Sequence, residues 1–178
     1  MALIYITGAS GAGKSTVRAE LQRRGYLAYD TDEDGLARWF ENRSGTEVSM
    51  PADPSQRDDN WYANNTYRLP LETVQRLAAE VEDGIGFVCG TVGNDDEIWE
   101  QFKAVISLSI DTETVRRRLS ERVGGFGSAG DELQRVLAWH AQVDADNSQY
   151  GAILIDATPP VAEVVDRLLT ELQQPKGS

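Results

Sequence analysis

Residues 8–15 read GASGAGKS, a run whose residue types and spacing suit the binding of a polyphosphate. Its glycines let the backbone curl without side chains in the way, so successive amide N–H groups can point at phosphate oxygens. The ammonium of Lys14 can reach the terminal phosphates, and the hydroxyl of Ser15 can bind magnesium. The run therefore predicts a site for ATP and Mg²⁺, formed by Gly8, Ala9, Ser10, Gly11, Ala12, Gly13, Lys14, Ser15 and Thr16.

Two carboxylates follow the second predicted strand, residues 26–29. Asp30 stands at the carboxyl end of that strand, where ligands bind in open parallel sheets. It can hold the hydration shell of magnesium or accept a proton from an acceptor hydroxyl. Asp32 could hydrogen-bond a polyhydroxy substrate. The alternative is an acidic helix start, and we interpret Glu33 and Asp34 as such cap charges.

The elements that must position these groups alternate along the chain. Residues 3–7 are an apolar run before the phosphate-binding loop, and a helical pattern follows the loop. Phosphate binding requires this strand and helix, whereas a chance match to the motif would not come with them. Five strands separated by helices predict a three-layer α/β sandwich with a five-stranded parallel sheet, in one domain of residues 1–178. The predicted strands are residues 3–7, 26–29, 85–90, 104–110 and 152–155, and the predicted helices are residues 14–24, 34–42, 70–83, 95–102, 112–123, 131–147 and 161–172.

Two further segments are candidates for binding or moving parts. Residues 44–66 are polar and predict a long loop, a feature that is usually functional or mobile. Its aromatic residues Trp61 and Tyr62, with the nearby Tyr67, could stack on an acceptor ring, and they could equally pin the loop to the core. Residues 124–130 are rich in glycine and predict a hinge.

The helix before this hinge carries several arginines. Arg118 and Arg122 stand at i and i+4, so they share one face of the predicted helix. A segment that closes with an arginine over the terminal phosphate would stabilise the charge of phosphoryl transfer and exclude water. The alternative is a solvated face on which Glu121 pairs with the neighbouring arginines.

Taken together, GASGAGKS near the N-terminus and YDTD after the second strand resemble the small P-loop kinases, a group that includes shikimate, gluconate and nucleoside monophosphate kinases. The resemblance spans nearly the whole chain. It implies the strand order 2-3-1-4-5, an acceptor-binding region at residues 44–68 and a lid at residues 116–130. Residues 44–66 depart from the shikimate kinase pattern.

The resemblance also implies roles for single residues. Asp30 would serve magnesium and Asp32 the acceptor, as in the Asp-Ser-Asp element of shikimate kinase-like proteins. Arg68 would contact the acceptor, Arg118 would lie over adenine, and Arg122 would reach the phosphates. The full prediction assigns catalysis to Lys14, Asp30 and Arg122, metal binding to Ser15 and Asp30, nucleotide binding to the loop with Arg118, Thr158 and Pro159, and acceptor binding to Asp32, Trp61, Arg68 and Gly90.

Composition limits the partners. The chain has 178 residues and a net charge of −12, from 29 acidic and 17 basic residues. Such a surface repels nucleic acid and anionic lipid, so we expect neither as a partner. The sequence lacks a signal peptide pattern and an apolar run of about 20 residues, and with its single cysteine, Cys89, it predicts a cytoplasmic protein, a monomer or homodimer. Cys89 and His140 are interpreted as core residues, and no zinc site is predicted.

These features favour an enzyme that transfers the γ-phosphoryl group of Mg-ATP to a small molecule. A nucleoside, a nucleotide, a sugar acid or a shikimate-like alcohol could be the acceptor. The alternative is an ATP-binding regulatory protein with slow ATPase activity and no small-molecule acceptor. A GTPase is disfavoured because the chain lacks the Asn-Lys-x-Asp element that usually binds guanine.

Overall fold

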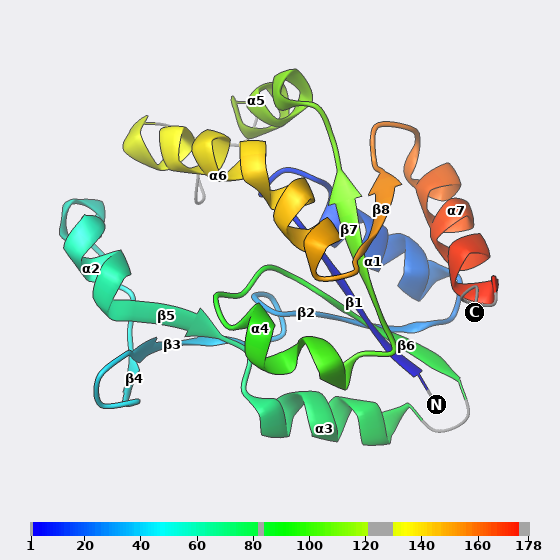
Figure 1. Ribbon diagram of the computed structural model, residues 1–178, viewed down its shortest axis with the longest axis horizontal. Helices are drawn as coiled ribbons and strands as arrows, with labels where there is room; N and C mark the ends of the chain where they lie inside the picture. The colour runs from blue at the N-terminus through cyan, green and yellow to red at the C-terminus, as the bar shows by residue number, and fades with distance from the viewer. Residues whose placement is uncertain (1, 82–83, 121–129, 175–178) are drawn as a thin grey trace.

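The computed structural model describes residues 2–81, 84–120 and 130–174, in which a parallel sheet lies between layers of helices (Figure 1). The elements in chain order are β1 (Ala2–Gly8), α1 (Lys14–Arg23), β2 (Leu27–Asp30), β3 (Arg38–Glu41), β4 (Glu47–Val48), η1 (Pro54–Gln56), α2 (Asp59–Asn64), β5 (Asn65–Arg68), α3 (Leu71–Glu80), β6 (Ile85–Cys89), α4 (Asp95–Ile98), η2 (Trp99–Gln101), β7 (Ala104–Ser109), α5 (Thr112–Ser120), α6 (Gly130–Gln149), β8 (Ile153–Asp156) and α7 (Val161–Gln173).

The central sheet has five parallel strands in the order β2-β6-β1-β7-β8, which confirms the predicted α/β class. Its labels differ from the expected 2-3-1-4-5 because three further strands, β3 to β5, fall between its second and third members in the chain. β1 is the middle strand, so the loop that follows it emerges at the centre of the carboxyl edge. The chain builds β2 and β6 on one side of β1 and β7 and β8 on the other. Ligands bind at the carboxyl edge of such sheets, at the strand where the order changes sides.

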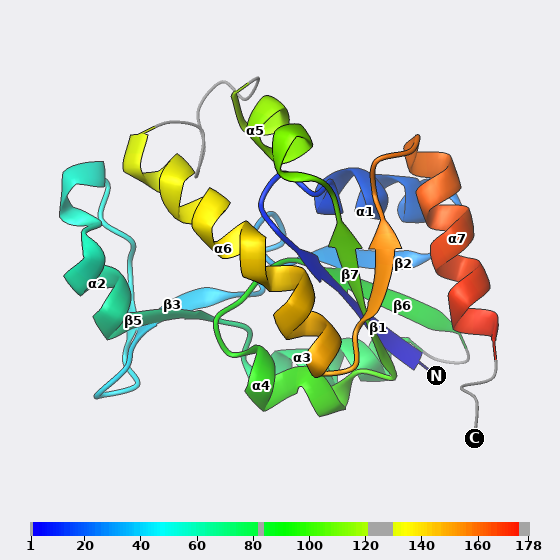
Figure 2. The ribbon, with the colours of Figure 1, turned by 45° about the horizontal axis from the view of Figure 1, so that its top comes forward.

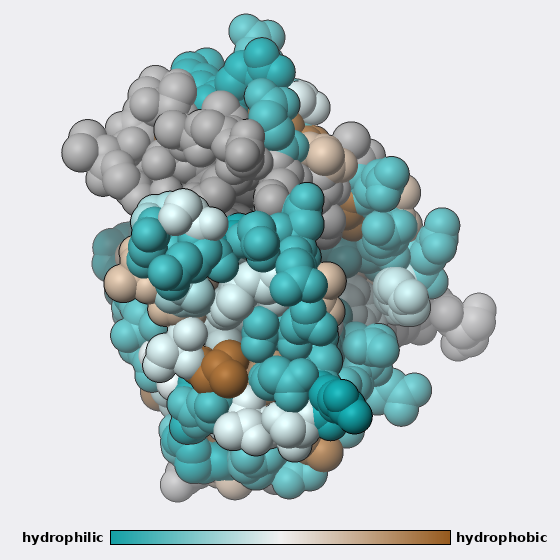
Figure 3. All heavy atoms as spheres, turned by 90° about the vertical axis from the view of Figure 1, so that its left-hand side faces the viewer, coloured by the Kyte–Doolittle hydropathy of each residue, from teal (hydrophilic) through white to brown (hydrophobic). Residues whose placement is uncertain are grey.

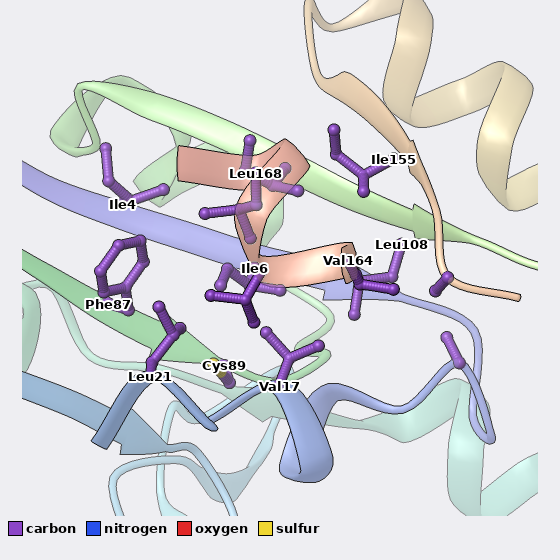
Figure 4. Packing of buried hydrophobic residues seen from close by; sticks show 14 of the residues in the cluster. Ile4, Ile6, Val17, Leu21, Phe87, Cys89, Leu108, Ile155, Val164 and Leu168 are labelled. Carbon is purple, nitrogen blue, oxygen red and sulfur yellow. The ribbon is translucent and has the colours of Figure 1, made fainter. Parts of the chain in front are cut away.

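The core has two parts because the side chains of β1 alternate between the faces of the sheet. Ile4 and Ile6 belong to a cluster with residues of α1 and α7, including Leu21 and Leu168 (Figure 4). Leu3 and Tyr5 instead join a second cluster with residues of α3 and α4. Both faces of the sheet are therefore covered, and β1 is buried throughout.

The first and last helices of the sandwich are joined by one arginine. Arg24, at the C-cap of α1, bonds Glu20 within its own helix at 2.7 Å. Its Nη1 also lies 2.5 Å from Oδ1 of Asp166, and its Nη2 donates to the carbonyl of Ala162 at 2.9 Å, both on α7. α7 thus holds α1, and with it the loop at the start of α1, in a set position.

On the other face, α6 packs along β7 through polar groups. Nδ2 of Asn147 donates to Oγ of Ser107 at 3.0 Å, and Oγ of Ser109 donates to the carboxylate of Asp144. His140, on the same helix, is buried, as expected for a structural residue. Cys89 is also fully buried in β6, where burial raises the pKa of its thiol.

Residues 34–42 were expected to form a helix, and this prediction is wrong. Residues 38–41 form β3, which pairs with β4 and β5 in an antiparallel three-stranded sheet. The pairing places Trp39 opposite Tyr67, and such cross-strand aromatic pairs stabilise a strand where local propensity does not decide.

The prediction of a long loop at residues 44–66 is also wrong, because this segment contains β4, α2 and the start of β5. The carboxylate of Asp58 caps α2 by accepting from the amide of Trp61 at 2.8 Å. Figures 1 and 2 show that α2 and the small sheet project to one side of the central sheet. Figure 3 looks at this side, and the residues coloured there are mostly hydrophilic.

None of the helices within the described residues combines the length and apolar character that crossing a bilayer requires.

Candidate active site

The loop between β1 and α1 has the curled backbone that the GASGAGKS sequence predicted. Gly8 and Gly13 both have positive φ, 136° and 100°, in the region that favours glycine. A Cβ at Gly8 would lie only 2.6 Å from the carbonyl oxygen of Leu108, so strand β7 also excludes a side chain there. Gly13 is the N-cap of α1, and the N–H groups and dipole of that helix favour an anion in front of it.

Two cations lie on this loop. Nζ of Lys14 donates to the carbonyls of Gly8 at 2.8 Å and Ala9 at 3.0 Å. Nη1 of Arg118, from α5, lies 3.2 Å from the carbonyl of Gly11, and its Nη2 bonds the carbonyl of Ala157 after β8 at 3.3 Å. Both cations can therefore offer charge to a phosphate held by the loop.

Ser15 and Asp30 face each other across the start of α1 and the end of β2. Oγ of Ser15 donates to Oδ2 of Asp30 at 3.5 Å, and Oδ1 of Asp30 accepts from the amides of Asp32 at 2.9 Å and Glu33 at 3.1 Å. A hydroxyl beside a buried carboxylate fits Mg²⁺, which keeps several waters and takes few protein oxygens. No cluster of three or more His, Cys, Asp or Glu side chains suited to a metal occurs within the described residues.

These groups surround a cavity of about 740 Å³ at the carboxyl edge of the sheet. A cavity of this size falls in the range usual for small-molecule sites. The phosphate-binding loop forms one side, and residues 30–33 form another. The lining residues are Ser10, Gly11, Ala12, Gly13, Lys14, Ser15, Thr16, Val17, Asp30, Asp32, Glu33, Gly90, Arg118, Ala157, Pro159, Val161 and Val164.

Asp32 is held in the cavity wall by its neighbours. Its Oδ1 accepts from Oη of Tyr67 at 2.7 Å and from Oγ1 of Thr31 at 3.2 Å, while the side chain remains exposed. Burial, and then the hydrogen bond to Asp32, raise the pKa of Tyr67. The phenol therefore stays a donor at neutral pH and orients this carboxylate.

Gly90 is placed against the same wall. A Cβ at this position would lie 1.9 Å from Oγ1 of Thr31, so the turn after β6 can approach the acidic segment only with glycine there. The close approach brings the ends of β2 and β6 together beside the phosphate-binding loop.

Of the predicted site residues that the structure describes, five lie outside the cavity lining: Gly8 and Ala9 at the start of the phosphate-binding loop, and Trp61, Arg68 and Thr158. Trp61 packs with other aromatic rings, at 4.6 Å from Trp39 of β3 and 5.1 Å from Tyr62 of α2 between ring centroids, and its role in binding an acceptor stays a prediction. Arg68 forms a salt bridge with Glu97. Thr158 donates from its amide to Oδ1 of Asp156 at 2.9 Å.

Arg122 lies outside the described residues, together with most of the predicted hinge. The described part of the predicted lid region is the end of α5 and the first residue of α6. The roles of Arg122 and of the lid therefore stay predictions.

Sequence reasoning missed three polar groups near the site. Glu33, which was taken as a cap charge, lines the cavity and forms a 2.5 Å ion pair with Arg18. Oγ1 of Thr91 donates to the carbonyl of Gly8 at 2.9 Å. Asp95 is partly buried at the start of α4, where its Oδ1 accepts from Oη of Tyr5 at 3.2 Å. The position of Thr91 directly after the predicted site residue Gly90 could have identified it. Glu33 and Asp95 could not be identified in this way, because their partners Arg18 and Tyr5 lie on other elements.

Asp95 has a perturbed pKa. Burial raises the pKa of its carboxyl to about 6, the nearby Asp96 adds to this, and the hydrogen bond from Tyr5 and the ammonium of Lys14 act in the opposite direction. Between the ordinary value of 3.8 and about 6, the folded protein keeps a proton that the unfolded chain releases. The free energy of unfolding therefore falls as pH rises through this window.

Asp95→Asn should remove this pH-dependent loss, because the amide keeps an oxygen for Tyr5 and carries no charge. We expect the variant to be more stable than the unsubstituted protein at pH 7.5, by roughly 2 kcal/mol, and equally stable near pH 4. Urea unfolding at several pH values measures this, with Asp146→Asn at an exposed position of α6 as the control. A stability difference that does not change with pH would contradict the assignment.

A parallel sheet with a glycine-rich phosphate-binding loop between its central strand and the next helix defines a P-loop protein. A model of the AAA domain family matches residues 4–126, more than half of the chain, and the chain therefore belongs to the AAA domain family. No curated protein sequence matches it closely enough to count as a relative.

Solved structures with a similar fold include several small kinases. The shikimate kinase of Acinetobacter baumannii, in complex with shikimate, is 16% identical with a TM-score of 0.64, covering 100% of this chain and 96% of that one. The shikimate kinase of Aquifex aeolicus is 21% identical with a TM-score of 0.57 and 96% coverage of both chains. The deoxyadenosine kinase of M. mycoides, with bound dATP, is 17% identical with a TM-score of 0.51, covering 98% of this chain and 100% of that one. The chain thus has the fold of the small P-loop kinases, as its motifs predicted.

Proposed function

We propose that this protein is a kinase that transfers the γ-phosphoryl group of Mg-ATP to a hydroxyl of a small molecule. The observation that supports this most directly is the shared cavity, which has a phosphate-binding loop on one side and carboxylates from the end of β2 on the other. Phosphoryl transfer depends mainly on positioning and charge stabilisation, and this arrangement supplies both.

In this proposal the chain's own residues have separate tasks. The loop amides and Lys14 bind the phosphates of ATP. Ser15 with Asp30 would hold Mg²⁺ through its water shell, and the ion would offset the negative charge of the phosphates. Asp32 accepts a hydrogen bond from the acceptor hydroxyl. The hydroxyl oxygen forms the new bond to the γ-phosphorus as the bond from that phosphorus to the β-phosphate oxygen breaks; the hydroxyl proton passes to the carboxylate of Asp32, and ADP leaves. Arg118 and Pro159 contact the nucleotide on the side formed by the turn after β8.

The test is transfer of phosphate from ATP to a mixed panel of nucleosides, nucleotides, polyols and hydroxy acids, with product detected by mass spectrometry. ATP turnover that requires an acceptor and yields its phosphate ester supports the proposal. If ATP binds and only slow hydrolysis occurs with every acceptor, the regulatory ATP-binding alternative replaces it.

Arg118→Ala is expected to weaken binding of Mg-ATP about tenfold, because one charge-assisted contact is lost from the nucleotide side of the cavity. Calorimetric titration measures the Kd for Mg-ATP. Thermal unfolding shows how far the loss of the bonds from Arg118 to the loop carbonyls destabilises the protein. Arg116→Ala is the matched control, since Arg116 is exposed on the same helix and does not line the cavity. Equal dissociation constants for the two variants would show that Arg118 supports the loop without touching the nucleotide.

A further inference from the structure

The turn between β6 and α4 is fastened at both of its ends. At its start, the amide of Gly90 donates to the carbonyl of Ile6 in β1 at 3.0 Å. At its end, the buried side chain of Asn94 accepts from the amide of Leu69 at 3.0 Å and donates to the carbonyl of Leu69 at 3.1 Å. Thr91 lies between these two anchors, so its side chain is held in a set position.

The hydroxyl of Thr91 bonds the same carbonyl as the ammonium of Lys14. Its Oγ1 donates to the carbonyl of Gly8 at 2.9 Å, and Nζ of Lys14 donates to that oxygen at 2.8 Å. The other carbonyl that Lys14 bonds, that of Ala9, also accepts from the amide of Ala12, at 3.1 Å. Each of the two carbonyls that hold the ammonium therefore has a second donor.

The second donor matters when the ammonium moves. An ammonium has three N–H donors, and that of Lys14 places two of them on carbonyls, so it can bond several phosphate oxygens only by leaving a carbonyl. A buried carbonyl that is left without a donor costs more free energy than an ordinary hydrogen bond contributes. Gly8 is buried, and the hydroxyl of Thr91 keeps a donor on its carbonyl when Lys14 turns to the phosphates.

We propose that Thr91 is a positioning residue for Lys14: its hydroxyl holds the carbonyl of Gly8, so that the ammonium can leave this carbonyl for the phosphates of Mg-ATP. This inference rests on the nucleotide binding in the proposed function. Thr91 does not line the cavity, so it acts on the nucleotide only through the loop and Lys14.

Thr91→Val removes the hydroxyl and keeps the shape of the side chain. In the free protein Lys14 still bonds the carbonyl of Gly8, whereas in the nucleotide complex this carbonyl loses both side-chain donors. We therefore expect the Kd for the nucleotide to rise about tenfold. Calorimetric titration of the full chain with Mg²⁺ and a non-hydrolysable ATP analogue measures the Kd.

Two further variants separate this role from general support of the fold. Thr91→Ser keeps the hydroxyl and should restore the Kd to near that of the unsubstituted chain. Thr170→Val is the matched control, because the hydroxyl of Thr170, at an exposed position of α7, also donates to a main-chain carbonyl, that of Asp166. This variant should leave the Kd unchanged.

The decisive measurement is the effect of Thr91→Val in a chain that already carries Lys14→Ala, titrated at higher analogue concentration because binding is weaker. Without the ammonium, the carbonyl of Gly8 keeps the same donors in the free and the bound state. Loss of the hydroxyl should then no longer change the Kd. A tenfold effect that persists in this background would mean that Thr91 supports the loop independently of Lys14, and it would overturn the inference.

The remaining outcomes distinguish the inference from the proposed function. An unchanged Kd in Thr91→Val, with normal binding by the unsubstituted chain, would overturn the inference alone. No binding of the analogue to the unsubstituted chain would contradict the proposed function, and the inference would fall with it. Should Thr91→Val not fold, Thr91→Ala makes the same comparison with a smaller side chain.

Discussion

Lys14→Ala is expected to lower kcat for phosphoryl transfer by at least about 100-fold, because it removes the cation closest to the phosphate-binding loop. The ammonium bonds the carbonyls of Gly8 and Ala9, so it already lies at the rim of the loop. In the proposed reaction it exchanges these carbonyls for phosphate oxygens and stabilises the charge of the transition state.

Initial rates with saturating ATP and acceptor measure this effect, and circular dichroism checks that the fold is retained. Lys103→Ala is the matched control, since Lys103 is an exposed lysine outside the cavity. Turnover of Lys14→Ala within a few fold of the control would refute the role of Lys14.

Asp30→Asn is expected to lower turnover on the order of 100-fold, and added magnesium should not restore it. The substitution separates two tasks of this side chain. An amide oxygen can still accept from the backbone of Asp32 and Glu33, so the turn after β2 keeps its shape. The negative charge beside Ser15 is lost, and with it the orientation of the magnesium water shell that the proposed function assigns to these two residues.

The measurement is the steady-state rate over a wide range of magnesium concentration, with Asp146→Asn as the control for loss of one carboxylate. Recovery of the full rate at high magnesium would mean that Asp30 only raises metal affinity. A normal rate at every concentration would mean that Asp30 has no part in the reaction.

The central sheet and the phosphate-binding loop could be predicted because their signals are local. Each buried strand is a short apolar run, and GASGAGKS combines glycine positions and a lysine that one mechanism explains. The placement of Asp30 followed from a general property of parallel sheets, since β2 ends beside the edge from which the loop emerges.

The small sheet could not be predicted, because its strands depend on partners elsewhere in the chain. β3 and β5 are each four residues long, and cross-strand pairs such as Trp39 with Tyr67 hold them together. Neither segment shows a long periodic pattern by itself, so the acidic run before β3 was extended into a helix that does not form.

Electrostatic partners were equally hidden from sequence reasoning. Arg68 was expected to contact the acceptor, and only the fold brings Glu97 from α4 against it. The raised pKa of Asp95 likewise comes from its burial in the fold, which outweighs the lowering effect of the hydrogen bond from Tyr5 of β1. Pairing and desolvation depend on distances between elements, which residue spacing along the chain does not contain.

The attachment of α1 to α7 has a consequence for how the protein is made. A ribosome synthesises the phosphate-binding loop long before it reaches Asp166, whose carboxylate fastens α1 through Arg24. Val161 and Val164, which complete one side of the cavity, also emerge late. A nascent chain therefore exposes its glycine loop early and completes this side of the cavity only after α7 has docked, so under the proposed function tight binding of nucleotide should appear only after α7 has left the ribosome.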